Sequence, residues 1–204
     1  DSGVEWIGEI PEHWEVKKLK HVAGHFMYGT SIDCNELGKG MPVLRIPNID
    51  NLEINFDDLK YTSLGNSETE KYLLKKNDIL VIRTNGNPES VGKSAIFKQE
   101  GTYIFASYLI RVKPKNNINP DFLINAMNSI SIRGSLTFSA RTSVGNYNLN
   151  TQSLGDCYIA YPPITEQSEI LTYVENTNDK IATTISLKEQ EIEKLKEYKM
   201  SLID

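Results

Sequence analysis

The sequence predicts an α+β protein, with one globular domain over residues 1–163 and one long helix over residues 164–204. Short apolar runs rich in β-branched residues, separated by Gly, Pro and Asn, predict strands. Asn119-Pro120 precedes a helical pattern of apolar residues, as an N-cap followed by Pro at the first helical position. Residues 165–203 contain neither Gly nor Pro. We therefore expect a mixed, twisted β-sheet with short helices, followed by a coiled-coil helix.

The local patterns place these elements in order along the chain. Residues 16–22 fit either a strand or a short helical turn, and residues 29–40 have the composition of a loop. Strands are expected at residues 41–46, 79–83, 94–97, 103–112 and 154–161. A capping box at Ser67-Glu68-Thr69-Glu70 predicts a short helix through Leu74, and the helix after Asn119 is expected to end at Gly134. Residues 84–88 suggest a turn, and the polar residues 139–150 are expected to be irregular.

The last helix carries an apolar seam. Tyr161-Pro162-Pro163 ends the preceding strand, and Thr165 is the expected N-cap, with Glu166 in the first turn. The seam residues recur at alternating spacings of three and four, as in a coiled coil. They are Leu171, Val174, Ile181, Ile185, Ile192, Leu195 and Leu202, with Asn178, Lys188 and Lys199 at the three polar positions.

This seam predicts a partner helix. A helix of about 38 residues is roughly 57 Å long, whereas a domain of this size is about 35–40 Å across. The alternative, a helix folded back onto its own domain, is disfavoured because charged residues crowd the other faces. Asn178 is a candidate register-setting residue. Lys188 and Lys199 would oppose their own copies in a parallel dimer, so an antiparallel or heterotypic pair is favoured.

Composition narrows the class of protein. The 204 residues are 39% hydrophobic and 24% charged, as in soluble globular proteins, and no run of 18 apolar residues predicts a membrane span. Cys34 and Cys157 form no CxxC motif, so neither a disulfide framework nor a zinc site is expected. We expect a cytoplasmic location. His21 and His25 lack a third metal ligand. Nucleotide-binding glycine motifs and a nucleophile motif are also missing, so we expect no metal, no cofactor and no catalytic activity.

The charge is unevenly distributed. The whole chain has a net charge of −5, but residues 81–150 carry eight basic and three acidic side chains, a net charge of +5. Chance clustering is the alternative to a phosphate-binding patch. Within this block, residues 83–93 and 139–147 are richest in side chains that can read base edges. The candidate DNA-binding residues are Arg83, Asn85, Asn87, Lys93, Arg141, Ser143, Asn146 and Tyr147, although Asn85 and Asn87 also suit turns.

Several stretches resemble one half of a specificity subunit of a type I DNA restriction-modification system. They are the opening residues 3–14, the segments 73–80 and 146–150, and above all Pro162-Pro163-Ile164-Thr165-Glu166-Gln167 with the helix that follows. The resemblance implies a DNA target recognition domain over residues 1–163 and a spacer helix over residues 164–204. A full subunit of this family has two of each, with the long helices antiparallel.

The resemblance also implies the partners. They are double-stranded DNA, methyltransferase subunits, a motor-nuclease restriction subunit, and either a second copy of the chain or the missing half of a longer one. The specificity subunit would select the DNA sequence and leave catalysis to its partners. The alternative is a coiled-coil scaffold with no DNA-reading role, against which the basic block argues. Whether the chain is a natural half-subunit or a fragment stays open.

Overall fold

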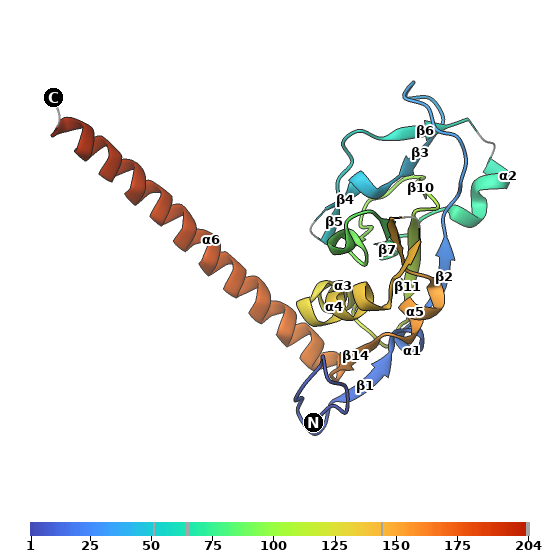
Figure 1. Ribbon diagram of the computed structural model, residues 1–204, viewed down its shortest axis with the longest axis horizontal. Coiled ribbons are helices and arrows are strands. Elements are labelled where there is room, and N and C mark those ends of the chain that lie inside the picture. The colour runs from blue at the N-terminus through green and yellow to red at the C-terminus, as the bar shows by residue number, and fades with distance from the viewer. Residues whose placement is uncertain (51, 64–65, 144, 203–204) are drawn as a thin grey trace. The chain divides into compact units, whose positions relative to one another are not determined.

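The computed structural model describes residues 1–50, 52–63, 66–143 and 145–202, and the side chains of all of these except residues 66, 67, 141 and 143. The chain divides into two compact units, Asp1–Ile164 and Thr165–Asp204 (Figure 1). The first unit is a mixed α/β domain with several sheets and short helices, and the second is a single long helix. The predicted fold class is confirmed.

The largest sheet of the first unit has six strands in the order β2-β11-β7-β9-β5-β4. They are β2 (Ala23–Tyr28), β11 (Leu109–Pro114), β7 (Ile79–Ile82), β9 (Ser94–Ile96), β5 (Leu52–Ile54) and β4 (Ile49–Asp50). Only β5 and β9 are parallel neighbours, and the other pairs are antiparallel. All four residues of β7 are buried, which explains why its sequence is continuously apolar rather than alternating.

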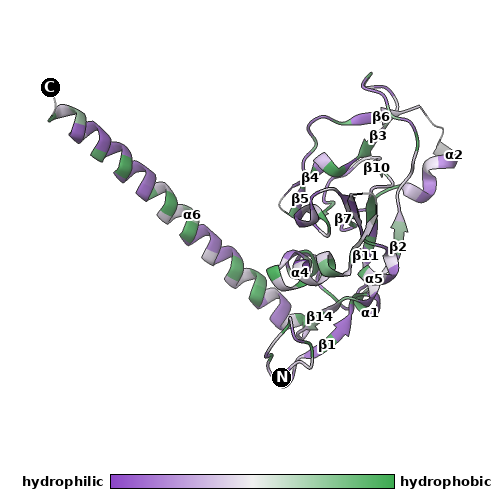
Figure 2. Ribbon diagram, viewed as in Figure 1, coloured by the Kyte–Doolittle hydropathy of each residue, from purple (hydrophilic) through white to green (hydrophobic). Residues whose placement is uncertain are grey.

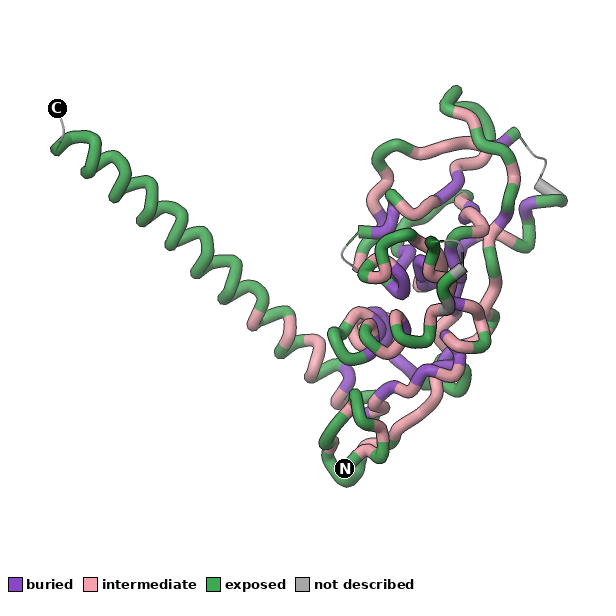
Figure 3. Tube along the Cα trace, in the orientation of Figure 1, coloured by how far each residue is buried: buried purple, intermediate pink, exposed green. Residues whose placement is uncertain are grey.

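A three-stranded sheet packs its apolar residues into the same core. Its order is β10 (Ile104–Phe105), β3 (Met41–Leu44) and β6 (Lys60–Thr62), with β10 parallel to β3. The core contains Leu44, Leu80, Phe97, Phe105 and Leu109. Figure 3 shows the buried stretches of the domain in purple. Rings of Phe56, Phe97 and Tyr103 meet edge to face at 5.4 to 6.4 Å between centroids.

Further elements of the domain are a two-stranded sheet and several short helices. The strands β1 (Glu15–Lys18) and β14 (Tyr158–Tyr161) form an antiparallel pair, and α1 (Leu19–Val22) follows β1. Residues 16–22 therefore contain both of the structures that their sequence fits. The short helices are α2 (Asn66–Thr69) and the 3-10 helices η1 (Ile46–Asn48), η2 (Glu70–Tyr72) and η3 (Pro88–Ser90). The strand predicted at residues 103–112 is two strands, β10 and β11, separated by a turn in which the Leu109 amide donates to the Ala106 carbonyl.

The helix after Asn119 begins as predicted but ends earlier. In α3 (Pro120–Asn128) the Asn119 side chain accepts hydrogen bonds from the Asp121 and Phe122 amides. The prediction that this helix ends at Gly134 is wrong. Ser129 has an extended backbone, with ψ at 149°, and its hydroxyl accepts from the Ile132 amide, which starts α4 (Ile130–Ser139). Gly134 lies inside α4.

Four further predictions are corrected by local caps or by distant pairing. Residues 154–156 belong to α5 (Thr151–Asp156), because the Asn150 side chain caps it by accepting from the Ser153 amide. The short helix before Leu74 begins at Asn66, so Ser67 lies within α2 and is not its cap. Thr84–Asn85, at the start of the segment predicted as a turn, form a two-residue strand, β8, and the turn follows from Asn85 onward. Residues 139–150 are not irregular, because they contain β12 (Arg141–Ser143) and β13 (Asn146–Asn148).

The second unit is the continuation of α6 (Ile164–Ser201), a helix of 38 residues. The length is as predicted, but Thr165 is not its N-cap, since the helix already begins at Ile164. Proline backbones at 162 and 163 are preset near helical φ, so the helix starts directly after them. Ile203, the expected last residue, lies outside the described residues. None of the helices in the described part of the chain has the length and apolar character needed to cross a membrane.

Candidate nucleic-acid interface

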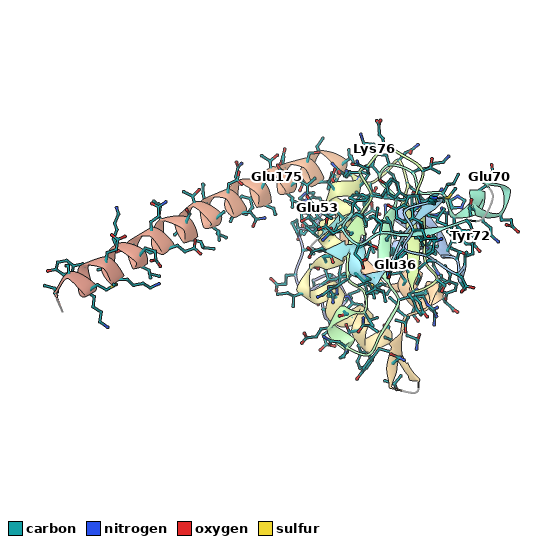
Figure 4. All side chains as sticks on the ribbon, turned by 90° about the horizontal axis from the view of Figure 1, so that it is seen from above. Glu36, Glu53, Glu70, Tyr72, Lys76 and Glu175 are labelled. Carbon is teal, nitrogen blue, oxygen red and sulfur yellow. The ribbon has the colours of Figure 1, made fainter. Side chains whose placement is uncertain are left out.

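The structure brings the two candidate segments together in one sheet. A three-stranded antiparallel sheet has the order β12-β13-β8. Tyr147 pairs with Asn85 and Asn148 with Thr84, while Thr142 pairs with Tyr147 from the other side. Six of the eight candidates therefore lie on or beside one sheet: Arg83, Asn85, Arg141, Ser143, Asn146 and Tyr147. In Figure 4 the β12–β13 hairpin is the pale orange pair of strands that projects at the lower edge of the domain.

Arg83 lies where this sheet joins the core. Its backbone amide donates to the Tyr108 carbonyl, and its carbonyl accepts from the Leu149 amide. The guanidinium carbon is 4.5 Å from the centroid of the Tyr28 ring, and Nη1 donates to the Ser107 carbonyl at 3.4 Å. Nε is buried and has no hydrogen-bond partner among the described residues. Arg83 is thus half-buried and held by a ring and a carbonyl.

Asn85 and Asn87 are committed to backbone geometry. The Asn85 Oδ1 accepts from the Asn87 amide at 2.9 Å, and the Asn87 Oδ1 accepts from the Glu89 amide at 2.9 Å, where Asn87 caps η3. Such bonds are the usual reason for Asn in turns. Both residues therefore have the turn role that the sequence left open. Their Oδ1 atoms are used in these hydrogen bonds, and their side-chain N–H groups are not.

Lys93 lies apart from the sheet, after the turn that η3 begins. Gly92 has a φ of +82°, which favours glycine, and a Cβ there would meet the Leu136 side chain at 3.2 Å. Exposed Lys93 lines a surface pocket of about 380 Å³ together with Arg133. Burial lowers the pKa of Arg133 while Glu89 opposes this, and the Arg133 guanidinium donates to the Glu89 carbonyl. This pocket is basic, since none of its lining residues is acidic.

Two of the four candidate residues in the hairpin, Asn146 and Tyr147, have side chains that the structure describes. Asn146 is exposed and Tyr147 is half-buried. The backbones of Arg141 and Ser143 pair with Asn148 and Asn146, but their side chains lie outside what the structure describes. Residues that the sequence analysis missed also lie here, namely Asn148, Thr84, Tyr28 and the 57% exposed Tyr108. The Asn-Tyr-Asn alternation of a polar strand was the available signal for Asn148.

Part of the basic block is structural. Arg111 is 5% exposed, donates to the Leu73 carbonyl at 2.9 Å and lies 3.9 Å from the buried Asp78 carboxylate. Burial raises the pKa of Asp78 and lowers that of Arg111, so desolvation outweighs their mutual attraction. Lys98 pairs with Asp121 at 2.8 Å. The charge available for phosphate is therefore smaller than the net charge of the whole block suggests.

The seam of α6 is exposed from Asn178 onward, whereas Leu171 and Val174 are half-buried. From Asn178 to Ser201 each residue is exposed, and Figure 2 shows apolar and polar turns alternating along the helix. Ile181, Ile185 and Ile192 are 51 to 53% exposed, and Leu195 is 60% exposed. Leu171, Val174 and Asn178 also lie in α6, whereas Leu202 follows its last residue. Lys188 donates to Glu191 and Lys196 to Glu193, which are pairs within the helix.

A comparison with protein families decides the assignment. The model of the type I restriction modification DNA specificity domain matches residues 11–197 of the chain. The chain belongs to this specificity-domain family. The match includes the globular unit and most of α6, which agrees with the resemblance that the opening residues and the Pro-Pro segment carried.

Relatives within the specificity-domain family support the same assignment. The EcoKI specificity subunit of Escherichia coli K12 is 27% identical over 175 residues, covering 84% of this chain and 38% of that subunit. The StySPI specificity subunit of Salmonella potsdam is 31% identical over 140 residues, covering 68% of this chain and 30% of that subunit. The chain thus spans well under half the length of these relatives.

Solved structures of the specificity-domain family share the fold. The HsdS subunit from Thermoanaerobacter tengcongensis matches with a TM-score of 0.63 and 18% identity. The match covers 86% of this chain and 40% of that subunit. At this identity the likeness concerns the fold alone.

Proposed function

We propose that this chain is one half of a specificity subunit, which reads one part of a bipartite DNA site and directs methyltransferase and restriction subunits to it. The observation that carries the proposal is the specificity-domain match over residues 11–197. The chain also contains one globular unit and one long helix, and it spans 38% of a relative such as the EcoKI subunit. Half of a specificity subunit would need one recognition domain and one spacer helix.

The DNA-reading surface is proposed to be the sheet β12-β13-β8 with its projecting hairpin. The major groove, about 12 Å wide, admits a two-stranded ribbon. Arg83 and the hairpin supply side chains that can read base edges, and Lys93 beside Arg133 supplies charge for the phosphate backbone. The chain itself selects the sequence, and its partners supply the catalytic groups.

The helix α6 is proposed to pair antiparallel with an equivalent helix, from a second copy or from the other half of a longer chain. Burying the seven apolar seam residues at ~1.5–3 kcal/mol each gives a gross gain of roughly 10–20 kcal/mol, before the costs of association. An antiparallel arrangement separates Lys188 and Lys199 from their own copies. In a homodimer, two-fold symmetry would require two inverted copies of one half-site.

Methylome sequencing tests the proposal. A host strain that carries the gene is compared with the same strain after its deletion. The expected result is a methylated motif with two specified parts and a fixed unspecified gap, present only with the gene. A methylome that does not change on deletion would contradict the proposal. A gel shift on random duplex DNA, with and without the methyltransferase subunit, separates DNA reading from a scaffold role, which predicts no shift by this chain.

A further inference from the structure

Two side-chain amides on β13, those of Asn146 and Asn148, form no hydrogen bond with a described group. Asn146 is exposed and Asn148 is half-exposed, and residues two apart on a strand lie on the same face. No hydrogen bond joins either amide to any side chain or backbone group that the structure describes. Some amides elsewhere in the domain are used: Asn48 donates to the Asn55 and Asp57 carbonyls, and Asn128 holds Ser94 through three bonds.

Among the described residues, β8 pairs with only part of β13. β8 ends at Asn85, so Asn148 has Thr84 beside it, while Asn146 lies next to Gly86, beyond the end of β8. A Cβ built on Gly86 would lie 3.7 Å from the Asn146 Oδ1. Because glycine has no side chain, the Asn146 amide is not covered from that direction. The outer part of the hairpin is therefore two-stranded, and no side chain at position 86 covers the Asn146 amide.

The contrast with Asn85 and Asn87 is chemical. An asparagine that reads adenine accepts from N6 and donates to N7, so it needs both ends of one amide free to turn toward the base. Asn85 and Asn87 have their Oδ1 atoms turned to backbone amides at 2.9 Å. Asn146 and Asn148 have no such commitment among the described groups. They are therefore better suited to adenine than the two asparagines of the preceding loop.

We propose that Asn146 and Asn148 form a pair that reads two adenines in the major groove, an inference that rests on the proposed function. Same-face residues two apart on a strand are separated by roughly 6.8 Å. Successive bases of one strand rise by about 3.4 Å. The two amides therefore match bases two steps apart. The half-site is expected to contain A·T pairs at two positions separated by one base pair.

The test compares Asn146→Ala and Asn148→Ala in the complex with methyltransferase subunits. Competition binding is measured between the methylated site and sites in which one A·T pair is replaced by G·C. The unmodified chain should prefer A·T roughly tenfold or more at both positions. Each variant should lose the preference at one position and keep it at the other. Asn116→Ala removes an exposed amide outside the hairpin and should leave both preferences intact.

The outcomes separate this inference from the function it rests on. A site without two A·T pairs at this spacing would overturn it. So would retention of both preferences in the two alanine variants, even with sequence-specific methylation intact. A methylome that is unchanged when the gene is deleted would instead overturn the proposed function. Asn146→Gln and Asn148→Gln keep an amide that can pair with adenine, so they should preserve more of the preference than alanine if the amide itself reads the base.

Discussion

At the scale of single residues, Arg83 is a candidate side chain that the domain already holds in place. The Tyr28 ring lies under its guanidinium and the Ser107 carbonyl accepts from Nη1. A side chain already held in place loses less conformational entropy when it binds. Arginine that donates both of its parallel N–H groups to guanine is the commonest base-specific contact in the major groove. Arg83 is therefore the first candidate for a guanine contact, with Arg141 of the hairpin as the second.

Replacing Arg83 and Arg141 together by Ala should abolish site-specific methylation. Each lost bidentate contact would reduce base discrimination by about 1–3 kcal/mol, and two such losses bring specific binding close to non-specific binding. The measurement is methylome sequencing of the variant strain, with circular dichroism to check the fold. Lys39→Ala together with Lys76→Ala removes the same charge from exposed positions outside the sheet and should have little effect. Unchanged methylation in the arginine variant would exclude both side chains as readers.

The two cysteines provide a second test at this scale. Cys157 is buried, and burial raises the pKa of its thiol to about 11, so at pH 8 it stays protonated and shielded. Cys34 is exposed, although partial burial also raises the pKa of its thiol. A thiol reagent at pH 8 should therefore modify Cys34 in the folded chain, and Cys157 only after denaturant is added. Rapid modification of both in the native protein would contradict the described packing around Cys157.

At the scale of elements, the sequence predicted best where the signal is local. The Asn119 cap, the apolar run of β7 and the long α6 each depend on residues close together in the chain. The prediction from the sequence failed where an N-cap residue interrupts a continuous apolar periodicity. Ser129 separates α3 from α4 although Met127 and Ile130 maintain the helical spacing across the break.

The candidate site shows a different limit. Side-chain chemistry identified both of its segments, but their pairing joins Thr84–Asn85 to residues about 60 positions later. The hairpin strands are polar in sequence, so they lack the alternation of apolar and polar residues by which a half-buried strand is recognised. The local roles of Asn85 and Asn87 could be weighed from the sequence but not decided. In the structure, backbone amides donate to the Oδ1 atoms of Asn85 and Asn87. This distinguishes them from Asn146 and Asn148.

The seam of α6 predicts self-association, or pairing with a second half. Ile185→Asp together with Ile192→Asp should give a monomer, because two charges would be buried at the centre of the apolar stripe. Light scattering at tens of micromolar measures this. Leu187→Asp with Tyr198→Asp is the matched control, because these residues are similarly exposed, at 60% and 63%, but lie off the seam. An unmodified chain that is already monomeric with its helix intact would contradict self-association for the isolated half.

At the scale of the whole molecule, each half is proposed to contribute one recognition unit and one spacer. A 38-residue helix is roughly 57 Å long, which corresponds to about 17 base pairs at ~3.4 Å each. If two such helices pair antiparallel, their length limits how far apart the two half-sites can lie. The half-site sequence would then depend on the domain, and the gap on the helix.

This division of roles is tested by deleting one heptad, residues 188–194, from α6. The deletion keeps the seam in register, because Leu195 takes the position of Lys188 three residues after Ile185. It shortens the helix by about 10 Å, or roughly three base pairs. Methylome sequencing of the deletion strain should show the same half-site bases with a gap shorter by about that amount. An unchanged gap, or altered half-site bases, would contradict the claim that the domain reads the sequence and the helix measures the spacing.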